Sequence, residues 1–69
     1  MPVSAKHKAI LRYAAKMRNT DKRWYAITYG MAKLYGHSPP SRPKGLSHMA
    51  AQAVEMEVRE ILQSTAKGQ

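Results

Sequence analysis

The stretch that decides the fold is residues 19–36, whose sequence is NTDKRWYAITYGMAKLYG. It opens with a polar turn signal in which Thr20 or Asp21 can cap a helix. It closes on Gly36, a residue that suits the left-handed end of a helix. We therefore predict a helix from about residue 22 to residue 35.

A strand over residues 23–29 is the competing prediction, because Trp, Tyr, Ile and Thr favour strands. Gly30 also weakens the helix prediction, since a glycine inside a helix costs about 1 kcal/mol relative to alanine. No other run of this kind occurs in the chain, however, and a lone strand has no partner. We therefore favour the helix.

The apolar residues of this helix fall on two sides at a rotation of ~100° per residue. One stripe consists of Trp24, Ile27, Met31, Leu34 and Tyr35. Another side carries Tyr25, Tyr29 and Ala32. A helix that is apolar on two sides is usually central, with neighbours on both flanks. We expect Trp24 to pack inside the protein.

Upstream of this stretch, Ser4 can cap a helix from about residue 5 to residue 18. Its apolar face consists of Ile10, Tyr13, Ala14 and Met17. Its opposite face carries Lys8, Arg12 and Lys16 at spacings of four. The apolar stripe can thus be buried while the basic stripe stays in water.

Downstream, residues 37–45 (HSPPSRPKG) contain three prolines and are predicted to form a partly extended loop that displays Arg42 and Lys44. Ser47 can cap a third helix over about residues 48–64. The apolar stripe of that helix consists of Ala50, Ala53, Val54, Val58, Ile61 and Leu62. Glu57 falls near this stripe, where we expect it to bond to a basic residue of the first helix. Residues 66–69 are expected to be a frayed tail.

These patterns predict an all-α fold: one compact three-helix domain over residues 1–69, with a Pro-rich basic loop between the second and third helices. A chain of 69 residues forms one domain at most. It has no cysteine, so a disulfide or a thiolate metal site is excluded. No apolar run approaches the roughly 20 residues that span a bilayer, and the first residues lack the apolar stretch of a secretory signal. We expect a cytoplasmic protein.

Charge is distributed unevenly along the chain. Ten of the 12 basic residues lie in the first 45 positions, and Asp21 is the only acid there. The other acids are Glu55, Glu57 and Glu60, and the formal net charge is +8. A positive field of this size favours polyanionic partners such as DNA or RNA.

Basic side chains are therefore the candidate contacts to phosphate groups. They are Lys8, Arg12, Lys16, Arg18, Lys22, Arg23, Arg42 and Lys44. Tyr25 and Tyr29 are candidate partner contacts, since tyrosines one helical turn apart can stack on bases or on a protein. The alternative, which we favour, is that both tyrosines pack between helices.

Several other functional classes are disfavoured. His7, His37 and His48 are scattered, so neither a metal site nor a cofactor is expected. We expect no enzyme, because no nucleophile motif and no Gly-rich phosphate loop is present. Ala32 and Gly36 have the spacing of a helix-turn-helix, but prolines occupy the place of its recognition helix. The basic helix also lacks the broad apolar face of a membrane-surface peptide.

Two functions from different classes remain. The first is a non-enzymatic nucleic-acid-binding protein, a small regulator that contacts phosphates through its basic surface. The second is a small regulator that docks on an enzyme of transcription or replication and modulates its activity.

Overall fold

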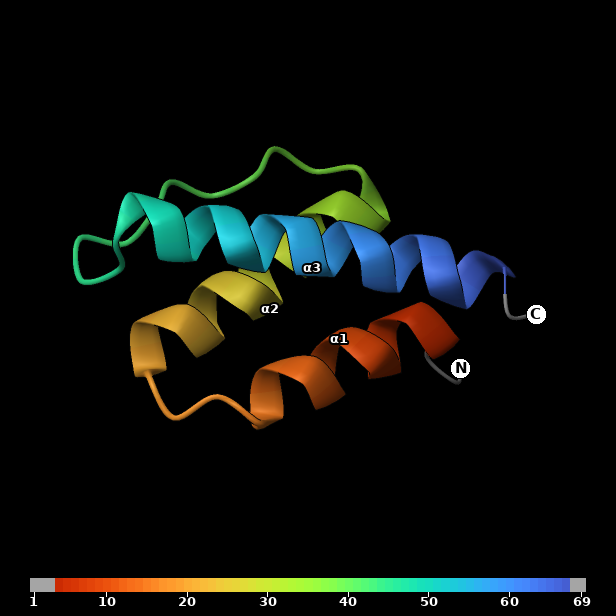
Figure 1. The fold of residues 1–69 in the computed structure, drawn as a ribbon. Helices are drawn as coiled ribbons and strands as arrows, with labels where there is room; N and C mark the ends of the chain where they lie inside the picture. Colours follow the sequence, from red (N-terminus) through yellow and green to blue (C-terminus); the bar gives the residue numbers. More distant parts are fainter. Residues whose placement is uncertain (1–3, 68–69) are drawn as a thin grey trace.

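The computed structural model describes residues 4–67 of the chain, with side chains through residue 64. It contains three helices, α1 (Ala5–Ala15), α2 (Thr20–Tyr35) and α3 (His48–Lys67) (Figure 1). The predicted all-α fold is confirmed, and residues 23–29 are helical.

Two serine side chains cap the N-terminal ends of helices, and one glycine caps a C-terminal end. Ser4 Oγ accepts a hydrogen bond from the His7 N–H at 3.1 Å, and Ser47 Oγ accepts one from the Ala50 N–H at 3.1 Å. Gly36 ends α2 with a positive φ of 76°, a conformation that other residues adopt at a cost. Both predicted serine caps and the glycine cap are confirmed.

Three helix boundaries differ from the prediction. Asn19 caps α2, its Oδ1 accepting from the Lys22 N–H at 3.0 Å, so Thr20 and Asp21 are already inside the helix. α1 ends at Ala15, because the N–H groups of residues 16 and 17 turn back to carbonyls three residues earlier and tighten the chain. α3 continues through residue 67, so residues 66 and 67 extend the helix instead of fraying, while residues 68 and 69 lie outside the described part of the chain.

α2 and α3 are parallel, and α1 runs the opposite way (Figure 1). The start of α2, the start of α3 and the end of α1 lie towards the same end of the protein. Sixteen residues of helix rise about 24 Å, so the segment 36–47 must return over that length before α3 can begin. Three prolines suit an extended crossing of this kind.

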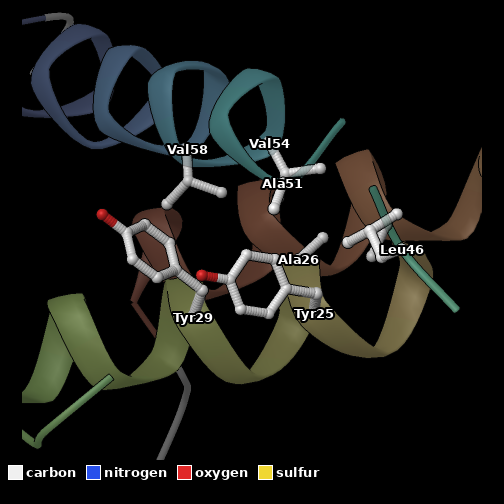
Figure 2. Close-up of a cluster of buried hydrophobic side chains, with 8 residues drawn as sticks. Tyr25, Ala26, Tyr29, Leu46, Ala51, Val54 and Val58 are labelled. Atoms are coloured by element: carbon white, nitrogen blue, oxygen red, sulfur yellow. The ribbon is translucent and has the colours of Figure 1, made fainter. Parts of the chain in front are cut away.

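The core lies where the three helices meet, since each helix packs against the other two. Its buried residues are Ile10, Ala14, Tyr25, Ala26, Tyr29, Ala32, Leu46, Ala51, Val54 and Val58. Figure 2 shows Val54 and Val58 of α3 facing Tyr25 and Tyr29 of α2. Leu46, which precedes α3 and which the helical patterns did not identify, fills one side of this cluster.

Gly30 has a packing reason for its place inside α2. A methyl carbon at this position would lie 2.7 Å from Cγ2 of Ile10, whose side chain is completely buried. The glycine lets α1 and α2 approach closely, and this gain outweighs its poor helix propensity.

The prediction that Trp24 packs inside the protein is wrong. Trp24 is 49% exposed and Tyr35 is 52% exposed, whereas Ile27, Met31 and Leu34 are partly buried. Among residues 4–64, α1 and α3 pack against the side of α2 that carries Tyr25, Tyr29 and Gly30, and Trp24 on the other side stays half exposed. We call this partly exposed stripe the α2 outer face; its residues are Trp24, Ile27, Met31, Leu34 and Tyr35.

Within residues 4–67, no helix is long and apolar enough to cross a membrane.

Candidate nucleic-acid interface

The first part of the candidate site is the basic stripe on α1. Lys8, Arg12 and Lys16 succeed one another at single-turn spacing and are all exposed. Ile10 and Ala14 on the other side of the helix are buried, which fixes this orientation. Among residues 4–64, no carboxylate pairs with these three side chains. Their charges therefore remain available to an external anion.

The second part is a pocket where α1 ends and α2 begins. Lys16, Arg18 and Lys22 all contribute to its wall. Its full lining is Tyr13, Lys16, Met17, Arg18, Asn19, Lys22 and Glu57, and its volume is about 390 Å³. The short turn between the helices brings three cations together that would otherwise be separated along the chain.

Arg23 ties the start of α2 to the turn that follows α1. Its Nε donates a hydrogen bond to the Met17 carbonyl at 3.3 Å. The acceptor is a neutral carbonyl, so the bond orients the guanidinium group without cancelling its charge. The side chain remains exposed and extends the positive surface along the start of α2.

The third part is the end of the Pro-rich loop. Arg42 Nη1 donates to the Leu46 carbonyl at 2.6 Å, and the Leu46 N–H donates to the Pro43 carbonyl at 3.1 Å. The carboxylate of Asp21 lies against Gly45, next to the first turn of α2. The side chains of Arg42 and Lys44 are both exposed, and the bond to the Leu46 carbonyl holds Arg42 against the residues that lead into α3.

Tyr25 and Tyr29 belong to the core. They are 4% and 3% exposed, and their ring centroids lie 5.6 Å apart (Figure 2). The Tyr25 hydroxyl donates to Glu55 Oε2 at 2.7 Å. Burial, followed by this hydrogen bond, raises the pKa of Tyr25 to about 12. Neither ring offers a face to a nucleobase, so packing between helices is their role in this structure.

Tyr13 replaces the basic residue that was expected to bond to Glu57. Its hydroxyl donates to Glu57 Oε1 and links α1 to α3. The pKa of Tyr13 is raised well above its ordinary value of 10, firstly by burial and secondly by the bond to Glu57. Both tyrosines that bond to glutamates thus remain protonated donors at neutral pH.

Two surface features were not singled out as functional by the sequence patterns. The first is the exposure of Trp24. Periodicity assigns this residue to an apolar stripe but does not show whether a neighbouring element covers that stripe. The second is a contact between His7 and Tyr35, in which His7 Nδ1 lies 2.6 Å from the hydroxyl oxygen of Tyr35. This contact joins the start of α1 to the end of α2.

No group of three His, Asp or Glu side chains that could hold a metal ion occurs within residues 4–67. Comparisons with protein-family models, with curated protein sequences and with solved structures found no match.

Proposed function

We propose that the protein binds nucleic acid without catalysing a reaction, through a surface that we call the basic surface. It consists of Lys8, Arg12, Lys16, Arg18, Lys22, Arg23, Arg42 and Lys44. The observation that supports this proposal is the placement of these charges. Lys8, Arg12 and Lys16 succeed one another along α1, and Lys16 joins Arg18 and Lys22 in the wall of one pocket. All eight side chains are exposed except Lys22, which is partly buried.

Phosphate contacts explain why such a surface binds. Each phosphate neutralised by Lys or Arg releases counterions, and the observed binding constant then falls steeply as salt rises. These contacts position a protein on the nucleic acid but carry no base specificity. We therefore expect binding to many sequences, in keeping with a small regulator that acts along nucleic acid.

The test compares two triple variants of equal charge. Changing Lys8, Arg12 and Lys16 to Gln should weaken binding and reduce the slope of log K against log salt by about 2–3. Fluorescence anisotropy over several salt concentrations measures both. Circular dichroism should show a folded protein, because the three side chains lie opposite the core.

The control removes the same charge elsewhere, by changing Lys6, Lys33 and Arg59 to Gln. It should retain most of the affinity and of the salt slope. Equal losses in both triple variants would show that net charge alone attracts the nucleic acid. Unchanged affinity in the first variant would reject the basic surface as the binding site.

A second candidate function has one observation in its favour, the α2 outer face with its half-exposed Trp24. Trp and Tyr are enriched among the residues that dominate protein interfaces. The net charge of +8 repels a second copy of this chain and attracts an acidic partner. The occupant we propose is an acidic face of an enzyme of transcription or replication.

This function predicts binding that resists salt and depends on Trp24. A protein recovered from a nuclease-treated lysate should be purified and tested directly against the native chain, Trp24→Ala and Thr28→Ala. Loss of binding in the first variant alone supports docking at the α2 outer face. Equal binding by all three proteins rules that face out.

A further inference from the structure

We infer that the pocket between the end of α1 and the start of α2 binds one unpaired nucleotide, so that the protein prefers single-stranded nucleic acid to duplex. This inference rests on the proposed nucleic-acid function and adds to it a site for the base. The inference is based on the wall of this pocket, in which cations, apolar groups and a carboxylate acceptor occupy different parts.

The size of the pocket suits a small organic group. Its volume of about 390 Å³ lies in the range of roughly 300–1,000 Å³ that is common for small-molecule sites. A single phosphate would contact only the cations and leave the apolar part of the wall, Met17 and the ring of Tyr13, without a ligand. A nucleotide is long enough to reach both.

The charges of the wall come from different elements. Lys16, Arg18 and Lys22 lie at the end of α1, in the turn and at the start of α2, whereas Glu57 comes from α3. Glu57 Oε1 accepts the hydroxyl of Tyr13, which leaves Oε2 as an acceptor without a partner among residues 4–64. The wall therefore offers cations from one pair of helices and a carboxylate from the third helix.

A nucleotide matches this division of the wall. Its phosphate fits the three cations, and its flat base fits against Met17 and Tyr13, since a thioether and an aromatic ring both accept a π-face. The exocyclic amino group of cytosine, adenine or guanine can donate to Glu57, whereas thymine and uracil have no such group. A base inside a duplex is stacked and paired, so it cannot enter the pocket without leaving the helix.

The experiment uses the native chain and four labelled probes of one length: oligo(dC), oligo(dT), an oligomer of abasic sites and a mixed-sequence duplex. Fluorescence anisotropy at one salt concentration compares their affinities. We expect oligo(dC) to bind about tenfold more tightly than the abasic oligomer and severalfold more tightly than oligo(dT). The duplex should bind more weakly than oligo(dC).

Two variants then test the roles within the pocket. Glu57→Gln should reduce or reverse the preference for oligo(dC) over oligo(dT), because an amide can donate to a thymine carbonyl. Glu60→Gln is the matched control, since it removes the same charge from α3 outside this pocket, and it should leave the preference unchanged. Lys22→Gln should weaken binding to all the single strands, the abasic oligomer included.

The results separate this inference from the proposed function. Equal affinity for all four probes, or tighter binding of the duplex, would overturn the nucleotide pocket and leave the basic surface standing. No binding to any probe at low salt would overturn both. The comparison of probes needs no variant, so it decides the matter even where a substitution disturbs the fold.

Discussion

Gly30 of α2 lies so close to Ile10 of α1 that a methyl carbon at residue 30 would be 2.7 Å from Ile10 Cγ2 and 3.0 Å from its Cδ1. Ile10 is completely buried and cannot move aside freely. The distance between α1 and α2 is therefore set by one glycine.

The variant Gly30→Ala should lower the stability of the protein even though alanine favours the helix by about 1 kcal/mol. Overpacking of a tight core typically costs 1–3 kcal/mol, so after the gain in helix propensity we expect a net loss of up to about 2 kcal/mol. Urea denaturation followed by circular dichroism measures it. The double variant Gly30→Ala, Ile10→Ala should lose less stability than the sum of the losses in the two single variants. The reason is that alanine at residue 30 then fills part of the space left by the Ile10 side chain.

Gly45→Ala is the comparison for this prediction. A methyl carbon there would meet the carboxylate of Asp21, which is an exposed side chain that can rotate away. We expect this change to cost less than Gly30→Ala. A larger loss at Gly45 would mean that the contact of Asp21 with the loop matters more to the fold than the contact between α1 and α2.

Val58→Asp should unfold the protein. Val58 is completely buried against α2, and an unpaired charge at such a site costs several kcal/mol against the small margin of a short domain. Met56→Asp, two residues away on the exposed side of α3, should keep the helical spectrum. Ile61 is only partly buried, so Ile61→Asp should lie between these two. A native melting temperature in the Val58 variant would show that α3 does not close the core.

The helices could be predicted from sequence because their signals are local. Ser4, Ser47 and Gly36 act through hydrogen bonds and backbone conformation within a few residues, and these rules operate before any tertiary contact forms. The orientation of α1 followed from the same kind of information, since Ile10 and Lys8 lie on opposite sides of an ideal helix.

The parts that could not be predicted depend on neighbours that are distant in sequence. Periodicity shows that Trp24 and Tyr25 point to different sides of α2, but only the packed structure shows that α3 covers the Tyr25 side and that Trp24 stays half exposed. The same limit applies to the pocket, where Glu57 of α3 lines the same wall as Lys16 and Lys22 after folding. Periodicity already grouped Lys8, Arg12 and Lys16 on one helix face, whereas the meeting of Lys16, Arg18 and Lys22 in one pocket required the turn to be placed.

Tyr25 provides a pH-dependent prediction. Its pKa is raised from 10 to about 12, so the folded state disfavours the tyrosinate. The corresponding stabilisation is complete below pH 10 and is lost as the pH rises through about 12. Absorbance titration of the native protein should therefore show two tyrosines, Tyr13 and Tyr25, ionising late, and Tyr25→Phe should remove the step near pH 12. An unchanged titration curve in the variant would contradict the bond to Glu55.

Arg42 and Lys44 carry the same charge but differ in their contacts. Arg42→Gln removes the bond to the Leu46 carbonyl and should lower stability by about 1 kcal/mol, a shift of roughly 4–8 °C in melting temperature for a chain of this size. Lys44→Gln should leave the melting temperature within about a degree. Each change should also reduce the salt slope of nucleic-acid binding by about 0.9. Equal melting temperatures in the two variants would show that Arg42 does not hold the loop.

The parallel arrangement of α2 and α3 has a consequence for the order of folding. α1 and α2 are joined by a turn of a few residues, so their pairing closes a small loop and is fast, whereas α3 can dock only after segment 36–47 has crossed the protein. We expect the transition state to contain the α1–α2 hairpin with α3 still largely undocked. Conservative truncations in α3, such as Val54→Ala, should then accelerate unfolding and leave the folding rate almost unchanged, while Ala26→Gly in α2 should slow folding.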